Sequence, residues 1–100
     1  MFVAVTFVEA RPEHVASLRA ALLLLTRHSL EHEPKCLRHD VSAHPLEPTG
    51  FLVYEVYEDE AAHRAHQDAE HVQWFEQSSG AWVATKRMLT YELISDAGQA

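Results

Sequence analysis

Side chains that can take up or release a proton gather in the second half of the chain. Glu55 lies in an aromatic and β-branched run, residues 51–58, where a carboxylate is costly to bury unless it is paired. Strand alternation places Glu55 and Tyr57 on one face, which we expect to point inward. His66 and His71 follow on a predicted helix. An imidazole works near neutral pH and a nearby carboxylate can orient it, so these residues suit proton abstraction from an acidic substrate.

Asp59 is a good N-cap for this helix, which we expect to break or to be capped again near His71 and then to continue to Ser79. Such a break can turn His66 and His71 toward the strand face of Glu55. We interpret His66 as the general base, Glu55 as its orienting partner, and His71 as a substrate ligand or second proton-transfer group. The alternative is that Glu55 and His66 form a structural hydrogen bond in a protein without catalytic activity.

Four residues are candidates for binding the substrate. Arg38 and Asp40, on the preceding strand, can bind its polar ends, although a surface ion pair explains them equally well. Trp74 and Tyr57 can contribute aromatic surface to the same pocket. The only cysteine, Cys36, is interpreted as a small apolar strand residue, not a nucleophile.

Histidine spacing also raises the possibility of a metal site. Residues 28–32 match the zinc pattern His-x-x-Glu-His, and His63, His66 and Glu70 share one side of a helix. Eight histidines make chance matches common, and a solvated helix face explains His63 and Glu70. We therefore predict no metal site, while metal binding by the histidine-rich helix stays open.

Composition limits the classes of function. The chain has 100 residues, 47% of them hydrophobic, which fits one domain over residues 1–95 with a loose tail at 96–100. The net charge of −7 argues against binding nucleic acid or an anionic membrane. No apolar run has the length of a membrane span and no basic signal-peptide start is present, so a cytoplasmic location is expected. Gly-rich phosphate loops and Gly-x-Ser-x-Gly elbows are absent from the sequence, so nucleotide chemistry and serine hydrolysis have no support.

The hydrophobic periodicity predicts six elements in the order β-α-β-β-α-β. They are strands at 1–9, 36–44, 51–58 and 85–94, and helices at 12–33 and 59–79. This order predicts an α+β, ferredoxin-like fold, in which an antiparallel four-stranded sheet carries its helices on one face. The first strand is apolar on both faces, so the helix-free face needs another cover. A second copy of the chain is the simplest one, and we therefore expect a homodimer.

The run YEVYEDEAAHRAHQDAEH resembles the signature of the antibiotic biosynthesis monooxygenase family. Its aromatic-Glu-x-aromatic strand, acidic cap, Ala-His pair and second histidine five residues later are Tyr54, Glu55, Tyr57, Asp59, Ala65, His66 and His71. The resemblance extends from Phe2 to about Leu93 and includes Cys36 to Val41. It implies a dimeric α/β barrel made of two sheets face to face.

The family resemblance also implies a reaction. It is nearest to the quinol oxygenases and to an isomerase of the phosphorylated signal autoinducer-2, and the haem-degrading branch fits less well. We therefore expect a cofactor-independent monooxygenase that abstracts a proton from a small quinol or a polyketide-like aromatic substrate. The alternatives are an isomerase of a small phosphorylated diketone signal, and a non-catalytic dimer that binds a ligand or responds to stress.

Overall fold

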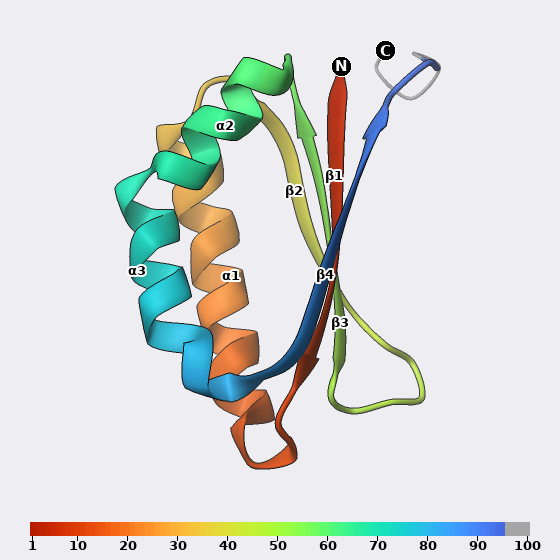
Figure 1. The fold of residues 1–100 in the computed structure, drawn as a ribbon, viewed down its shortest axis with the longest axis vertical. Helices are drawn as coiled ribbons and strands as arrows, with labels where there is room; N and C mark the ends of the chain where they lie inside the picture. Colours follow the sequence, from red (N-terminus) through yellow and green to blue (C-terminus); the bar gives the residue numbers. More distant parts are fainter. Residues whose placement is uncertain (96–100) are drawn as a thin grey trace.

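The structure is a computed structural model and describes residues 1–95 of the chain, so the predicted tail at 96–100 lies outside the described residues. Its elements follow the predicted order (Figure 1). They are β1 (Phe2–Ala10), η1 (Pro12–His14), α1 (Val15–His32), β2 (Cys36–Ala43), β3 (Gly50–Tyr57), α2 (Glu60–Asp68), α3 (Glu70–Ser79), η2 (Gly80–Trp82) and β4 (Val83–Glu92). The second predicted helix is thus two helices, α2 and α3.

The four strands form one antiparallel sheet in the order β2-β3-β1-β4. Helices α1, α2 and α3 all pack on the same face, which we call the covered face (Figure 1). The opposite, uncovered face carries no helix of the described residues. This arrangement confirms the predicted α+β, ferredoxin-like fold.

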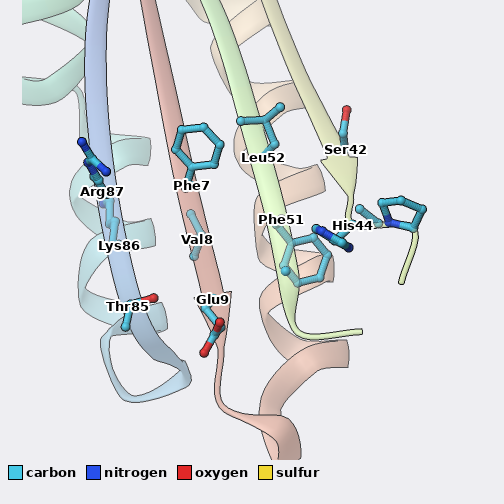
Figure 2. Close-up of a pocket in the computed structure, with 13 residues that line it drawn as sticks. Phe7, Val8, Glu9, Ser42, His44, Phe51, Leu52, Thr85, Lys86 and Arg87 are labelled. Atoms are coloured by element: carbon cyan, nitrogen blue, oxygen red, sulfur yellow. The ribbon is translucent and has the colours of Figure 1, made fainter. Parts of the chain in front are cut away.

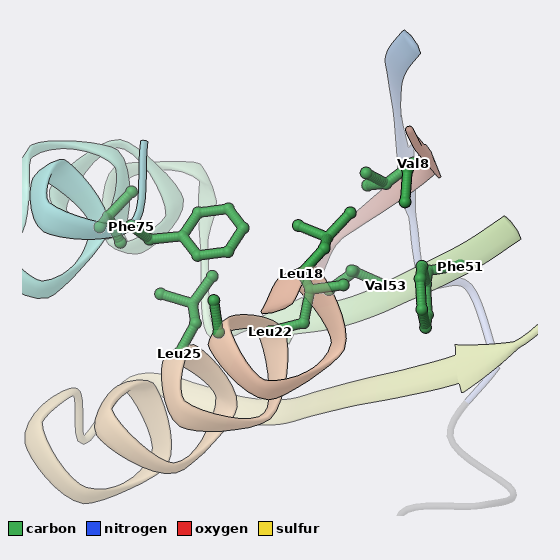
Figure 3. Packing of buried hydrophobic residues seen from close by; sticks show 10 residues of the cluster. Val8, Leu18, Leu22, Leu25, Phe51, Val53 and Phe75 are labelled. Atoms are coloured by element: carbon green, nitrogen blue, oxygen red, sulfur yellow. The ribbon is translucent and has the colours of Figure 1, made fainter. Parts of the chain in front are cut away.

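The main core lies between α1, α3 and the covered face (Figure 3). Leu18, Leu22 and Leu25 recur at helical spacing along α1, and all three are buried. They pack against Val53 of β3 and Phe75 of α3, among others. Burying one such side chain stabilises a fold by about 1.5–3 kcal/mol, so this layer fixes the position of α1 and α3 on the sheet.

A bulge near the start of β2 changes which of its residues face the helices. Cys36 lies opposite Tyr57 and His39 lies opposite Glu55, with a register shift between these pairs. Cys36 and His39 are therefore both buried, whereas Leu37 is exposed. Simple strand alternation would place Cys36 and His39, three residues apart, on opposite faces of β2, and this expectation is wrong because a bulge adds one residue and reverses the alternation.

The uncovered face is apolar near its centre and partly exposed. Phe7 of β1 keeps 49% of its surface accessible, and Tyr91 of β4 keeps 58%. A hollow of about 640 Å³ lies at the Gly50 end of the sheet and is lined by residues from all four strands, among them Phe7 and Leu52 (Figure 2). Within residues 1–95, no helix has the length and apolar character needed to cross a membrane.

Candidate active site

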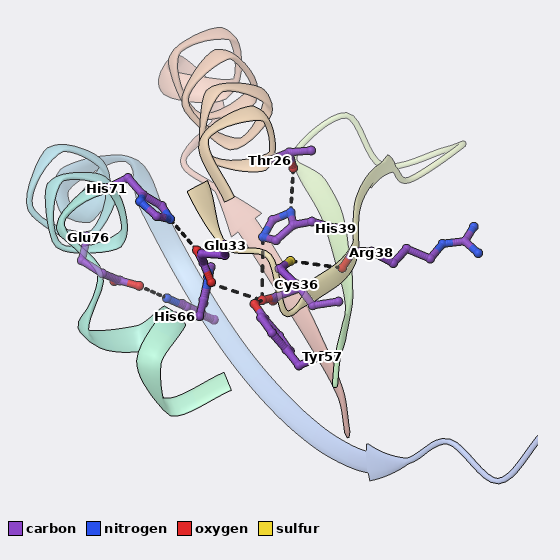
Figure 4. A network of polar contacts seen from close by, with 11 residues as sticks. Thr26, Glu33, Cys36, Arg38, His39, Tyr57, His66, His71 and Glu76 are labelled. Carbon is purple, nitrogen blue, oxygen red and sulfur yellow. Dashed lines mark hydrogen bonds and ion pairs between the residues drawn. The ribbon is translucent and has the colours of Figure 1, made fainter. Parts of the chain in front are cut away.

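A buried polar cluster that includes His39, Tyr57 and His66 lies between the sheet and the helices (Figure 4). Glu55 contacts all three of these residues and so occupies its centre. Its carboxylate accepts a hydrogen bond from the Tyr57 hydroxyl on the same face of β3. Nε2 of His66, on α2, lies 3.4 Å from Glu55 Oε1. Nε2 of His39, on β2, lies 3.7 Å from the same oxygen. Residues from three elements therefore converge on one carboxylate oxygen.

A second carboxylate, Glu33, holds the other side of His66. Nδ1 of His66 lies 2.8 Å from Glu33 Oε2, and Nε2 of His71 lies 2.5 Å from the same oxygen. A carboxylate only accepts hydrogen bonds, so both ring nitrogens donate to it. Glu33 follows the last residue of α1 and precedes Pro34, which cannot continue the helix. The end of α1 thus places a carboxylate between two histidines.

The break between α2 and α3 makes this arrangement possible. Ala69 has an extended backbone with ψ of 147° and is both the C-cap of α2 and the N-cap of α3. The break therefore lies two residues before His71, which becomes part of the first turn of α3. Asp59 caps the start of α2, because its side chain accepts a hydrogen bond of 2.8 Å from the backbone N–H of Ala62. Both caps fix the direction in which His66 points.

Burial and charge act on the carboxyl groups in different directions. Burial raises the pKa of Glu55, and this exceeds the lowering effects of the Tyr57 hydrogen bond and the charge of His66. Burial also raises the pKa of Glu33, but here the hydrogen bonds and charges of His66 and His71 prevail and the pKa is lowered. The contacts with His66 and His71 thus favour the ionised form of Glu33, whereas burial shifts Glu55 in the opposite direction.

The surrounding groups are kept neutral by burial. Burial, together with the charge of His66, lowers the pKa of His39 to about 4. Nδ1 of His39 lies 2.7 Å from Thr26 Oγ1, which fixes the ring. Burial and the Glu55 charge raise the pKa of Tyr57. Burial raises the pKa of the Cys36 thiol to about 12, as expected for an unreactive side chain.

Glu55 and His66 open on a cleft of about 170 Å³ between α2, α3 and the sheet. Its other walls are mostly apolar and include Val53, Phe75 and Met88. The hollow on the uncovered face is larger, but neither Glu55 nor His66 lines it. Chemistry at these two residues therefore belongs to the smaller cleft.

The remaining predicted site residues lie elsewhere. Arg38 and Asp40 form an exposed ion pair of 2.5 Å, and the Arg38 guanidinium lies 6.0 Å from the ring centroid of Tyr54. In the pairing of β2 with β3, Arg38 lies opposite Val56 and Asp40 lies opposite Tyr54, so both side chains are on the uncovered face and Glu55 is on the covered one. Trp74 is 46% exposed and lines a separate surface hollow with His28 and others. The structure thus brings together Glu55, Tyr57, His66 and His71, but not Arg38, Asp40 or Trp74.

The sequence model of the family described as "Antibiotic biosynthesis monooxygenase" matches residues 1–78. The chain belongs to this family. Its matched region contains every member of the polar cluster, from Glu33 to His71. A comparison with curated proteins gives no match.

Solved structures with the same fold include other proteins named for the antibiotic biosynthesis monooxygenase family. One is a candidate member from Nitrosomonas europaea, with 21% sequence identity, a TM-score of 0.90, and coverage of 95% of this chain and 100% of that one. Another, from Deinococcus radiodurans, is 24% identical with a TM-score of 0.87 and coverage of 95% and 94%. A protein from Pseudomonas aeruginosa is 23% identical with a TM-score of 0.87 and covers 94% of both chains. Identities this low support the fold alone.

Glu33 and His39 are the cluster members that sequence reasoning missed. Glu33 is separated from His66 by 33 positions and from His71 by 38, so no local spacing connects them. The sequence pattern places His39 on a strand face without a partner, because its approach to Glu55 depends on how β2 pairs with β3. The available signal is the Glu-Pro pair at residues 33–34, which by itself indicates only the end of a helix.

Proposed function

We propose that this member of the antibiotic biosynthesis monooxygenase family oxidises a small quinol with dioxygen and needs no bound redox cofactor. The observation that carries the proposal is the carboxylate–imidazole pair of Glu55 and His66 at an apolar cleft. A purely structural pair would be closed off from solvent by packing, whereas Glu55 and His66 both line the cleft. Apolar walls also favour an aromatic substrate over a sugar phosphate.

His66 is the proposed general base. Its Nδ1–H is held by Glu33, so the lone pair of the neutral ring is on Nε2, which is directed toward Glu55 and the cleft. The distance of 3.4 Å between Nε2 and Glu55 Oε1 exceeds an ordinary hydrogen bond. A substrate hydroxyl can therefore compete for Nε2. In this assignment Glu33 is the positioning residue for His66, a role that the sequence prediction gave to Glu55.

Glu55 is proposed to stabilise the charge that the reaction creates. When Nε2 takes the phenolic proton, the imidazolium lies between Glu33 and Glu55, and both carboxylates favour it. The phenolate then gives electrons to dioxygen, and oxygen bonds to the ring carbon that bears two hydrogens in the keto form. Loss of water from the resulting hydroperoxide leaves a new carbonyl group. One oxygen atom enters the product and the other leaves as water. The substrate supplies all four electrons that reduce dioxygen, so no external reductant is needed.

The volume of the cleft favours a substrate with one aromatic ring. An apolar cavity of about 150 Å³ can hold benzene, and the cleft measures about 170 Å³. A polycyclic substrate would require Phe75 or Met88 at the cleft wall to move. Within the substrates expected for the family, the small quinols therefore fit this chain better than polycyclic polyketides.

We further propose that the protein works as a homodimer joined through the uncovered face. Phe7 and Tyr91 expose large aromatic surfaces there, and Phe7 also lines the 640 Å³ hollow. Monomeric proteins rarely leave so much contiguous apolar surface in water. Pairing two such faces would give the dimeric α/β barrel that the family resemblance implies.

Oxygen uptake tests the proposed reaction. Protein purified without an affinity tag is mixed with a panel of single-ring hydroquinones, and the spontaneous oxidation rate is subtracted. His66→Gln should lower kcat by about a hundredfold to ten-thousandfold, because it removes the general base. His14→Gln, outside the cluster, is the matched control and should keep the wild-type rate.

Three results would contradict the proposal. They are the absence of enzyme-dependent oxygen uptake across the panel, full turnover in His66→Gln, and stoichiometric flavin, haem or metal that is needed for turnover. Deuterium exchange into a phosphorylated diketone without oxygen uptake would instead favour the isomerase alternative.

A further inference from the structure

Three histidines form a nearly equilateral triangle on the outer side of the cluster. His28 and His32 lie one turn apart on α1, and His71 faces them from the first turn of α3. The ring centroids are separated by 6.0 Å for His28–His32, 6.2 Å for His28–His71 and 6.3 Å for His32–His71. The Glu33 carboxylate adjoins this triangle through its 2.5 Å contact with His71 Nε2.

The ring nitrogens of His28 and His32 are available to a ligand. Within residues 1–95, the rings of His28 and His32 form no hydrogen bond or ion pair. Both residues can be reached from solvent, since His28 is half-buried and His32 is exposed. Histidines that are held in place by packing would have partners, as His39 and His66 do. The triangle thus presents two histidines with unpartnered ring nitrogens beside the contact between His71 and Glu33.

The spacing is close to what a tetrahedral metal ion requires. Zinc binds imidazole nitrogen at about 2.0–2.1 Å, so three imidazoles around one ion have ring centroids about 5 Å apart. The observed triangle is wider by about one ångström on each side. Two histidines at i and i+4 on a helix project to the same side, and small rotamer changes bring them inward.

We propose that His28, His32, His71 and Glu33 bind one divalent transition-metal ion, with zinc as the ion whose preferred ligands they match. Imidazole nitrogen and carboxylate oxygen are both zinc ligands, and four of them suit its tetrahedral coordination. The ion takes the place of the proton between His71 Nε2 and Glu33 Oε2. Glu33 Oε1, which lies 3.1 Å from His66 Nδ1, continues to hold His66. The site is therefore distinct from the Glu55–His66 pair.

This ligand set differs from an inner alternative made of Glu33, His66 and His71, whose ligand atoms all lie within 4.8 Å of one another. The inner set would use Nδ1 of His66, which is buried and already engaged with Glu33. The outer set shares Glu33 and His71 with the inner one and replaces buried His66 by His28 and His32, whose nitrogens have no partner among the described residues and can be reached from solvent. Substitutions at His66 and at His28 or His32 separate the two sets.

Metal titration of the tag-free, metal-stripped full chain tests the proposal without any substrate. Zinc binding is measured by calorimetry, and cobalt(II) is added separately to record the visible absorption of a tetrahedral site. We expect one ion per chain. His28→Gln and His32→Gln should each weaken binding by about a hundredfold, because even the outer hydrogen-bonding partners of metal ligands contribute ten- to a hundredfold. The thermal unfolding midpoint of the wild type should rise by about 10–20 °C at a zinc concentration one hundred times Kd.

His66→Gln and His14→Gln are the two comparison variants. His66→Gln removes a hydrogen-bonding partner of Glu33 and should weaken zinc binding less than His28→Gln and His32→Gln do, whereas His14→Gln should bind zinc with nearly wild-type affinity. Circular dichroism of each variant verifies that it folds. The proposal is overturned if the wild type shows neither heat nor cobalt absorption. It is equally overturned if His66→Gln abolishes binding while His28→Gln and His32→Gln do not, or if His14→Gln weakens binding as much as they do. None of these results bears on quinol turnover, which is measured separately.

Discussion

Replacing Glu55 by Gln should separate activity from stability. Burial raises the pKa of Glu55, so the folded protein binds this proton more tightly than the unfolded chain. The contribution of Glu55 to stability is therefore fully present below its ordinary pKa of 4.5 and is lost as the pH rises through the raised value. Glutamine keeps the shape and cannot ionise, so Glu55→Gln should avoid that loss.

The sign of the expected change in stability is definite. Because burial raises the pKa of Glu55, ionising it at pH 7 destabilises the fold, so the free energy of unfolding and the melting temperature at pH 7 should be higher for Glu55→Gln than for the wild type. The amide oxygen of the introduced glutamine can still accept the Tyr57 hydroxyl, so this hydrogen bond is kept. Turnover should fall by about a hundredfold or more, because the charge that stabilises the His66 imidazolium is gone.

The assay combines thermal or urea unfolding at pH 4 and pH 7 with oxygen uptake on the best quinol. Wild type and Glu55→Gln should differ in stability at pH 7 and much less at pH 4, where the wild-type carboxyl is protonated. Tyr57→Phe is the matched control, because it removes only the hydroxyl that donates a hydrogen bond to Glu55. It should lower the free energy of unfolding by about 1 kcal/mol. A Glu55→Gln protein that is about 1–3 kcal/mol less stable at pH 7 and retains full activity would refute this reasoning, because loss of a purely structural partner behaves that way.

Buried groups and the uncovered face give three other predictions. Burial lowers the pKa of His39 to about 4, so between pH 6.5 and 4 only the unfolded chain takes up this proton, and the free energy of unfolding should fall by about 3 kcal/mol over that range. In urea unfolding, the free energy of His39→Gln should depend less steeply on pH. An unchanged pH dependence would contradict the assignment. Ser29 is fully buried and its Oγ lacks a hydrogen-bond partner among the described residues, so Ser29→Ala should raise the free energy of unfolding by about 1 kcal/mol. A lower free energy of unfolding would indicate that this hydroxyl is hydrogen-bonded in solution. Sedimentation should give the mass of two chains for the wild type and of one for Phe7→Lys on the uncovered face; a wild-type monomer at micromolar concentration would exclude the proposed dimer.

The fold could be predicted because each element carries its own local signal. The helical spacing of Leu18, Leu22 and Leu25 and the alternation around Glu55 are properties of single segments, and each was found where it was predicted. The bulge in β2 carries no such signal. Leu37 resembles any other strand residue, and its register becomes visible only when β3 is paired with β2. Counting alternate residues therefore failed for Cys36.

The cluster itself was only partly predictable for the same physical reason. Glu55 and His66 could be connected because strand alternation and helical spacing each direct a side chain to the same layer. Glu33 lies at the end of a different helix, and its contacts with His66 and His71 exist because α1 packs beside α3. A carboxylate beside a proline gives no indication of that packing. Its importance is a property of tertiary structure.

Burying the polar cluster lowers the stability of the fold, and this cost indicates that the cluster serves a function. Glu55, His39 and His66 are deeply buried, at 5%, 2% and 5% exposure. His39 Nε2 has no hydrogen-bond partner among the described residues and approaches only Glu55, at 3.7 Å. A fold that needed only packing at this layer would be more stable with aliphatic side chains, as the Leu22 region is. Local conflict with stability is expected where residues serve chemistry, because selection keeps them for another reason. The Glu55→Gln measurement addresses this point directly, since a more stable and less active protein is what a functional cluster predicts and a structural cluster does not.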